Sequence, residues 1–168
     1  MICKLSSVQD FNDVVLISSH DQAIVTQCAR LMSETDPWHA MGFSEDECLA
    51  TLTASDIVIH VVWDGGTVSA FLASLARGVV EEPLIRIVCV RRELQGAGLG
   101  SHLLDFFESV LFPNAANLFL CVSETNVRAK VLYERRGYLA VGKFSDWIYP
   151  NQAEFLMRKT RGPRRKSV

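Results

Sequence analysis

The sequence contains no apolar run long enough to cross a membrane. Every hydrophobic stretch in its 168 residues is far shorter than the roughly 18 residues that a spanning helix needs. The first residues, MICKLSSVQDFND, lack the apolar core of a secretory signal peptide and contain acids early. Apolar residues make up 49% and charged residues 21% of the chain, as in ordinary globular domains. We therefore expect a cytoplasmic protein without a membrane partner.

Closely spaced metal-binding or redox-active cysteines are also lacking. None of the five cysteines forms a CxxC pair; they are Cys3, Cys28, Cys48, Cys89 and Cys121. The four histidines are scattered in the same way. An odd number of widely spaced thiols fits a reducing compartment, and thiols in apolar runs usually behave as small buried hydrophobes. We expect no metal site.

The net charge is only −2, but the charge is unevenly distributed. Residues 1–76 contain ten acids and two bases, whereas residues 77–168 contain fifteen bases and nine acids. This asymmetry indicates that the two halves face different ligands, although solvated surface would explain it equally well. The ending RKTRGPRRK carries six bases and no acid. We expect a flexible basic tail over 161–168 and no nucleic-acid partner, which would need a wider basic surface with stacking aromatics.

Hydrophobic periodicity predicts one α/β domain over residues 1–160. Apolar and β-branched runs predict strands at 12–19, 56–63, 67–76, 84–90, 117–123, 138–144 and 153–159. Helical spacing predicts helices at 21–34, at 44–54, from 99 to Pro113, and at 126–136. The third of these has Leu99, Leu103, Phe106 and Val110 on one face. The Asp-Gly pair at 64–65 predicts a hairpin, and Ser44 with Glu47 forms a capping-box pattern. The order β-α-α-β-β-β-α-β-α-β-β predicts a mixed, mostly antiparallel central sheet with a crossover helix.

A glycine-rich turn, ELQGAGLG, joins the run 84–90 to the helix that follows. The P-loop pattern fails because no lysine follows the glycines, and the dinucleotide pattern GxGxxG fails at its last position. A third pattern, [QR]xxGx[GA], fits at Gln95, Gly98 and Gly100. In such a turn, glycines let backbone amides approach a pyrophosphate closely, and the helix dipole favours the anion. The sequence therefore predicts a pyrophosphate site.

This turn, with the strand before it and the helix after it, resembles the acetyl-CoA motif of the GNAT N-acetyltransferase family. A second segment, NVRAKVLYERRGY, is similar to the family's Asn-x-x-Ala-x-x-x-Tyr-x-x-x-Gly-aromatic stretch. The resemblance covers about residues 12–159 and is to small bacterial-type members. It implies that an acetyl group moves from acetyl-CoA to a primary amine of a small molecule or peptide, by direct attack in a ternary complex. A homodimer is compatible with it. The alternative is a degenerate domain that only senses acyl-CoA, and Tyr133 argues against that alternative.

The resemblance also implies which residues contact acetyl-CoA. These are Val88, Val90, Gln95, Gly96, Ala97, Gly98, Leu99, Gly100, Ser101 and Asn126. The backbone groups of Val88 and Val90 would pair with the pantetheine arm and polarise the thioester. Asn126 could be a plain helix N-cap, a cofactor contact, or both.

The remaining candidates concern proton transfer and the acceptor. Tyr133 occupies the family's general-acid position, where a phenol can protonate the leaving thiolate, although a core tyrosine would show the same pattern. Many relatives carry a glutamate where this chain has Leu84, so Glu82, on the same strand face, is the candidate base through a water. The alternative is that no single base exists. Ring-bearing residues would either wall the acceptor slot or pack a lid; they are Trp38, His39, Trp147 and Tyr149.

Overall fold

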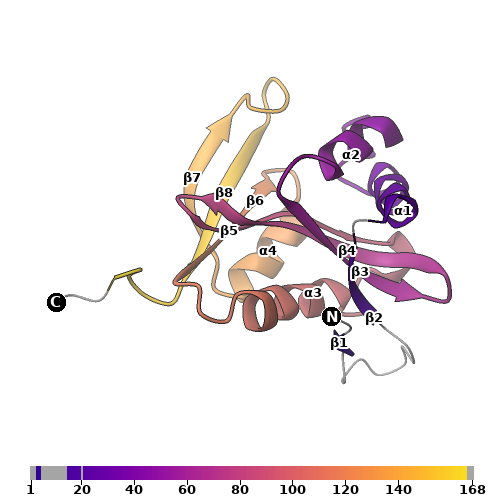
Figure 1. The fold of residues 1–168 in the computed structure, drawn as a ribbon. Helices are drawn as coiled ribbons and strands as arrows, with labels where there is room; N and C mark the ends of the chain where they lie inside the picture. The colour runs from indigo at the N-terminus through magenta and orange to yellow at the C-terminus, as the bar shows by residue number, and fades with distance from the viewer. Residues whose placement is uncertain (1–2, 5–14, 20, 166–168) are drawn as a thin grey trace. The chain divides into compact units, whose positions relative to one another are not determined.

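The computed structural model describes residues 3–4, 15–19 and 21–165 (Figure 1). These residues belong to two compact units. Unit 1 contains Met1–Ser74 and Ile87–Leu104, and unit 2 contains Leu75–Arg86 and Asp105–Val168. Strands β4 (Thr67–Val79) and β5 (Glu82–Val90) and helix α3 (Leu99–Phe106) have residues in both units. The predicted strand residues 12–14 and tail residues 166–168 lie outside the described residues.

In unit 1 the strands follow the order β1 (Cys3–Lys4), β2 (Val15–Ser19), β3 (Ile57–Asp64), β4 and β5. The pairs β1–β2 and β2–β3 are antiparallel. Helix α1 (Gln22–Ser33) begins at Asp21, whose carboxylate accepts the Ala23 N–H at 2.8 Å, and packs against α2 (Glu45–Leu52). Helix α2 begins with the predicted capping box. The short strand β1 was not predicted.

Two hairpin turns connect β3, β4 and β5. In the first, Gly65 and Gly66 adopt φ values of 54° and 101°, as the Asp-Gly signal predicts. In the second, Val80 and Glu81 have φ values of 48° and 65°, a left-handed conformation that these residue types rarely adopt. Because this turn carries no glycine or asparagine, it could not be predicted from the sequence. As a result, β4 is longer and β5 begins earlier than predicted.

In unit 2 the strand order is β4, β5, β6 (Asn117–Ser123), β8 (Ala153–Thr160) and β7 (Leu139–Ser145). Strands β5 and β6 are parallel, with Leu84 opposite Phe119, whereas β6–β8 and β8–β7 are antiparallel. Helix α4 (Val127–Arg135) begins after Asn126 and ends before Gly137, whose φ is 87°. The prediction of an α/β fold with a mixed, mostly antiparallel sheet is confirmed.

The helix after the glycine turn departs from its predicted periodicity. The sequence placed Leu99, Leu103, Phe106 and Val110 on one buried face, but Val110 is 51% exposed. The α-helix gives way to a π-helical turn, η2 (Phe107–Leu111). A π turn contains an extra residue, so it rotates the following side chains around the axis. Glu108, which α-helical spacing places opposite the apolar face, is therefore buried.

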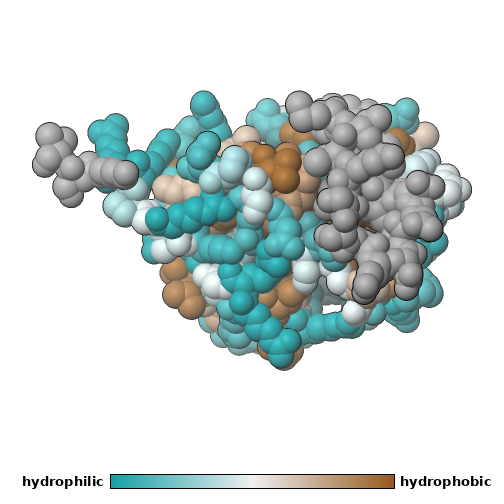
Figure 2. All heavy atoms as spheres, turned by 90° about the horizontal axis from the view of Figure 1, so that it is seen from below, coloured by the Kyte–Doolittle hydropathy of each residue, from teal (hydrophilic) through white to brown (hydrophobic). Residues whose placement is uncertain are grey.

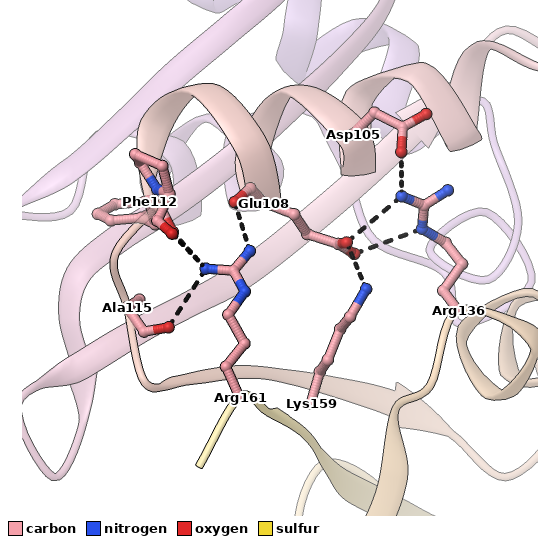
Figure 3. Close-up of polar contacts among 8 residues, drawn as sticks. Asp105, Glu108, Phe112, Ala115, Arg136, Lys159 and Arg161 are labelled. Carbon is pink, nitrogen blue, oxygen red and sulfur yellow. Dashed lines mark hydrogen bonds and ion pairs between the residues drawn. The ribbon is translucent and has the colours of Figure 1, made fainter. Parts of the chain in front are cut away.

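A cluster of charged side chains surrounds Glu108 and connects η2, α4 and β8 within unit 2 (Figure 3). Glu108 is only 4% exposed, and its carboxylate accepts Lys159 Nζ at 2.6 Å and Arg136 Nε at 3.3 Å. Arg136 also forms an ion pair with Asp105. Arg161 donates to the main-chain carbonyl of Glu108 at 2.7 Å. Because Arg136 follows the last residue of α4, the cluster fixes the end of that helix.

The surface of the described residues combines a polar cover with apolar patches. Hydrophilic residues cover much of the face shown in Figure 2, and separate hydrophobic patches lie between them. No helix among the described residues is long and apolar enough to span a membrane. In the basic C-terminal segment, Arg161 and Arg164 donate to main-chain carbonyls of unit 2.

Candidate functional site

The glycine turn opens directly onto the N-terminus of α3. Gly96 and Gly98 have φ values of 94° and 93°, a conformation that side chains disfavour. The His102 N–H donates to the Gly98 carbonyl at 3.1 Å and closes the first turn of the helix. The amides of residues 99–101 precede this bond, so they have no acceptor within the helix and point out of its start. Such amides, together with the helix dipole, form a site for an anion.

Side chains hold this turn in place from both ends. Gln95 Nε2 donates to the Val90 carbonyl at 3.1 Å and ties the turn to the end of β5. His102 Nδ1 lies 2.8 Å from the Gly98 carbonyl and donates to it. Leu99 is buried and anchors the first turn of α3. Gln95 was predicted to contact acetyl-CoA; its side-chain amide stabilises the turn by bonding to β5.

Val88 and Val90 lie in the last part of β5, on either side of Cys89. Cys89 is fully buried, and its Sγ lies 3.8 Å from the Leu31 carbonyl of α1. Because side chains alternate along a strand, those of Val88 and Val90 point away from α1. Burial raises the pKa of Cys89 to about 12, so the thiol stays protonated and packs as a small hydrophobe.

Most charged groups near this region are engaged in local contacts. Arg92 lies 3.7 Å from the Asp36 carboxylate, and Arg91 donates to the Val68 carbonyl at 2.7 Å. Glu45 accepts Arg30 Nε at 3.2 Å. Asp36 and Glu45, two of the ten acids of residues 1–76, therefore each have an arginine partner. Among the described residues, no group of three or more histidine, cysteine or acidic side chains is arranged to hold a metal ion.

The four candidate acceptor contacts fall into two pairs, one in each unit. In unit 1, the Trp38 carbonyl accepts the Phe43 N–H at 3.1 Å, and His39 Nδ1 lies 3.2 Å from a main-chain carbonyl. In unit 2, Trp147 and Tyr149 belong to the turn between β7 and β8. Trp147 is exposed, and its ring packs at 5.1 Å from that of Phe144. Each pair consists of residues that are close in the sequence and belong to one unit.

Tyr133 lies in the second half of α4 and is only 8% exposed. Its ring packs edge-on against Tyr138, with ring centroids 6.1 Å apart. Burial raises the pKa of Tyr133 to about 12. The phenol is therefore protonated throughout the neutral range, which is the state that a proton donor requires.

Asn126 is the N-cap of α4. Its side-chain oxygen accepts the Ala129 N–H at 3.2 Å, and its carbonyl accepts the Lys130 N–H at 3.0 Å. The capping role weighed from the sequence is thus present. A contact of the same side chain with acetyl-CoA stays a prediction.

Glu82 is the first residue of β5 and is 8% exposed. Its carboxylate accepts Asn117 Nδ2 at 3.4 Å and lies 3.9 Å from Arg164 Nε. These contacts hold it beside the beginning of β6, at the opposite end of β5 from Val88 and Val90. Its role as a base stays a prediction.

Two buried carboxylates, Glu108 and Glu154, were not expected from the sequence. Glu154, the second residue of β8, is 7% exposed and lies opposite Ser123 of β6. Burial raises the pKa of Glu154, and a hydrogen bond from Ser123 offsets part of this effect. The only signal in the sequence is a glutamate inside the apolar run AEFLM, which a strand with one solvated face would also show.

Comparisons with known proteins agree with this fold. A model of the acetyltransferase (GNAT) family matches residues 25–138, and no curated protein matches the chain. The ribosomal-protein-S18-alanine N-acetyltransferase from Escherichia coli is 19% identical and matches with a TM-score of 0.72. The match covers 91% of this chain and 97% of that chain. The aminoglycoside 6'-N-acetyltransferase from Enterococcus faecium is 15% identical, with a TM-score of 0.65 over 92% of this chain and 99% of its own. An aminoglycoside 6'-N-acetyltransferase complexed with coenzyme A is 16% identical, with a TM-score of 0.67 over 90% and 99%. Since the family model matches well over half of its length, this chain belongs to the acetyltransferase (GNAT) family.

Proposed function

We propose that this chain is an N-acetyltransferase that moves the acetyl group of acetyl-CoA to a primary amine by direct attack within a ternary complex. The observation that carries this proposal is the turn before α3. Gly96 and Gly98 hold the left-handed backbone that lets the amides of residues 99–101 meet at the helix start. These amides fit the pyrophosphate of acetyl-CoA. The family to which the chain belongs supports the same assignment.

The end of β5 would hold the other part of acetyl-CoA. Backbone groups of Val88 and Val90 pair with the pantetheine arm and polarise the thioester carbonyl. Gln95 holds the loop against β5, so the two parts of the donor site keep a fixed spacing. Such positioning of the reacting carbonyl can lower the barrier by several kcal/mol.

Tyr133 supplies the proton that the leaving group needs. As the amine nitrogen bonds to the carbonyl carbon, the carbon–sulfur bond breaks and leaves a thiolate. The phenol, which burial keeps protonated, gives its proton to this sulfur and recovers one from solvent. Glu82 is the base that the sequence suggests, although Asn117 and Arg164 already contact its carboxylate.

The acceptor is a primary amine of a small molecule or a peptide. Trp38, His39, Trp147 and Tyr149 are the candidate contacts. The similar enzymes named above act on an alanine of ribosomal protein S18 or on aminoglycosides. Four cysteines are free thiols, which supports a cytoplasmic location: Cys28, Cys48, Cys89 and Cys121. A homodimer remains part of the proposal.

Binding and turnover test this proposal separately. Calorimetry should show binding of acetyl-CoA. Chromatographic measurement of CoA release, which the protein's own thiols cannot disturb, should identify an acceptor among polyamines, aminoglycosides, amino acids and peptides with free N-termini. Binding of acetyl-CoA without turnover of any amine would favour the alternative, an acyl-CoA sensor. Failure to bind acetyl-CoA would overturn both functions.

A further inference from the structure

We infer that Glu154 takes the proton from the acceptor amine and that the hydroxyls of Ser123 and Thr125 carry this proton to solvent. The inference rests on the proposed function, because it assigns the base of the same reaction. All of the residues that carry it belong to unit 2.

The register of the strands sets the direction of Glu154. Glu154 of β8 is paired with Ser123 of β6, and the next residue, Phe155, packs under Lys130 of α4, with Nζ 4.4 Å from the ring centroid. Because side chains alternate along a strand, Glu154 points to the opposite face from α4. Tyr133 is carried by α4. The acid and the base therefore belong to opposite faces of the same strands.

This arrangement suits a reaction with two substrates. The acid must reach the sulfur of the donor, whereas the base must reach the nitrogen of the acceptor. Groups on opposite faces can each meet one substrate without competing for the same proton. General bases must come within hydrogen-bond reach of the proton that they remove, directly or through one water.

Pairing with cations distinguishes Glu154 from the other buried glutamates of unit 2. Glu82 lies beside Arg164, and Glu108 is bonded to Lys159 and Arg136. Within the described part of the chain, no lysine or arginine forms an ion pair with Glu154. A carboxylate that is held by cations is a weak base, because its charged form is stabilised. Glu154 is the buried glutamate of this unit that keeps its basicity.

The groups around Glu154 leave it poised to accept a proton. The Cys121 thiol lies on the same face, and the charge of Glu154 adds to the effect of burial in raising the pKa of Cys121, while Arg86 opposes it. Glu124 and Lys143 pair with each other at 2.9 Å, and Lys143 Nζ lies over the Phe155 ring, on the face opposite Glu154. Burial raises the pKa of Glu154 despite the hydrogen bond from Ser123. A pKa moved toward neutrality makes a carboxylate a better base while it stays ionised.

A pair of hydroxyls leads from Glu154 to the surface. Ser123 is buried and hydrogen-bonds Glu154, and its Oγ lies 3.0 Å from Oγ1 of Thr125, which is exposed. After the amine has given its proton to Glu154, the carboxylic acid can pass it to Ser123. Ser123 releases its own proton to Thr125, and Thr125 releases one to water. The carboxylate is regenerated, and one proton has moved from the amine to solvent.

Glu154→Gln tests the base in the wild-type background with an acceptor that the amine panel identifies. We expect kcat/KM to fall by about 100-fold or more, with the Kd for acetyl-CoA unchanged. The acidic limb of the pH profile of kcat/KM should also disappear, because the group whose ionisation it reports is absent. The control is Glu124→Gln, which removes a neighbouring exposed carboxylate paired with Lys143 and should retain the wild-type profile.

Variants of the hydroxyls test the path to solvent. Ser123→Ala should lower kcat by roughly tenfold, within the range of general acid–base effects, and Ser123→Thr, which keeps the hydroxyl, should recover most of this loss. A merely structural role of Ser123 would be disturbed more by the larger threonine. If Glu154→Gln fails to fold, judged by circular dichroism, Glu154→Asp keeps the charge on a shorter arm and should retain the acidic limb with a lower kcat.

Three results would overturn the inference. A wild-type kcat/KM with an unchanged acidic limb in Glu154→Gln would exclude Glu154 as the base. The proposed acetyl transfer itself would not be affected by this result. Loss of that limb in Glu82→Gln instead would assign the base to Glu82. Absence of turnover in the wild-type protein with every amine would overturn the inference together with the proposed function.

Discussion

Glu108→Gln should destabilise the fold strongly. Regular α-helical spacing would place Glu108 on the solvent-facing side of its helix, but the π turn buries it. The carboxylate is buried and bonded to both Lys159 and Arg136 (Figure 3). Glutamine keeps the shape and one acceptor oxygen but removes the negative charge. The variant therefore leaves two cations next to a neutral group in a poorly solvated place.

The contacts set the size of the effect. Removing one partner of a buried ion pair typically costs about 3–5 kcal/mol, because the remaining charge stays buried without compensation. Here Arg136 keeps its ion pair with Asp105, and the Lys159 side chain is still 26% exposed. We therefore expect a value near the low end, about 3 kcal/mol. For a chain of this size that corresponds to a decrease in Tm of roughly 6–12 °C.

Urea and thermal unfolding, followed by circular dichroism, measure this change in the free energy of unfolding. The matched control is Lys143→Gln, which breaks an ion pair between two exposed side chains and should cost less than about 1 kcal/mol. A change below about 1 kcal/mol in Glu108→Gln would refute the argument, because it would mean that the cluster is solvated enough to tolerate an unpaired charge.

Three further predictions concern the donor site, the acid and a buried histidine. Gly98→Glu should abolish measurable binding of acetyl-CoA in calorimetry, because the carboxylate repels the pyrophosphate and the φ of 93° strains any side chain. The control is Gly98→Ala, whose Cβ would meet His102 only at 3.5 Å, so that it measures the backbone strain alone. Unchanged affinity in the glutamate variant would contradict the assignment of the turn. Tyr133→Phe should lower kcat about 100-fold with an unchanged Kd for acetyl-CoA. A wild-type kcat in this variant would show that Tyr133 has only a structural role in the core. Burial lowers the pKa of His60 from 6.5 to about 4, so the unfolded chain binds a proton first. The contribution of neutral His60 to the free energy of unfolding is thus complete above about pH 6.5 and is lost as the pH falls toward 4. His60→Gln should therefore reduce the dependence of the free energy of unfolding on pH, measured by urea titrations over this range. Equal pH dependence in the wild-type protein and the variant would show that His60 contributes nothing.

Local signals made much of the fold predictable. The capping box of Ser44 and Glu47 and the Asp-Gly turn at 64–65 each act within a few residues, so the sequence displays them directly. The glycine turn was readable for the same reason. Its backbone conformation requires glycine at Gly96 and Gly98 whatever surrounds them.

The errors arose where distant residues decide the conformation. The π turn buries Glu108, and its charge is neutralised by Arg136 and Lys159, which lie 28 and 51 residues away. No local pattern contains that information, so α-helical spacing placed Val110 in the core. The turn at Val80 and Glu81 is similar, since the pairing of β4 with β5 holds it and its residue types do not favour it.

The same distinction explains why the sequence selected Tyr133 but not Glu154. Tyr133 stands in a motif whose resemblance to the GNAT family implies its role, whereas Glu154 acquires its setting only when β8 pairs with β6 and places it opposite Ser123. Burial then acts on both groups in one direction and raises both pKa values. For a phenol this keeps the proton in place, and for a carboxylate it strengthens the basicity of the charged form. In the proposed reaction, the same exclusion of water therefore suits Tyr133 to donate a proton and Glu154 to accept one.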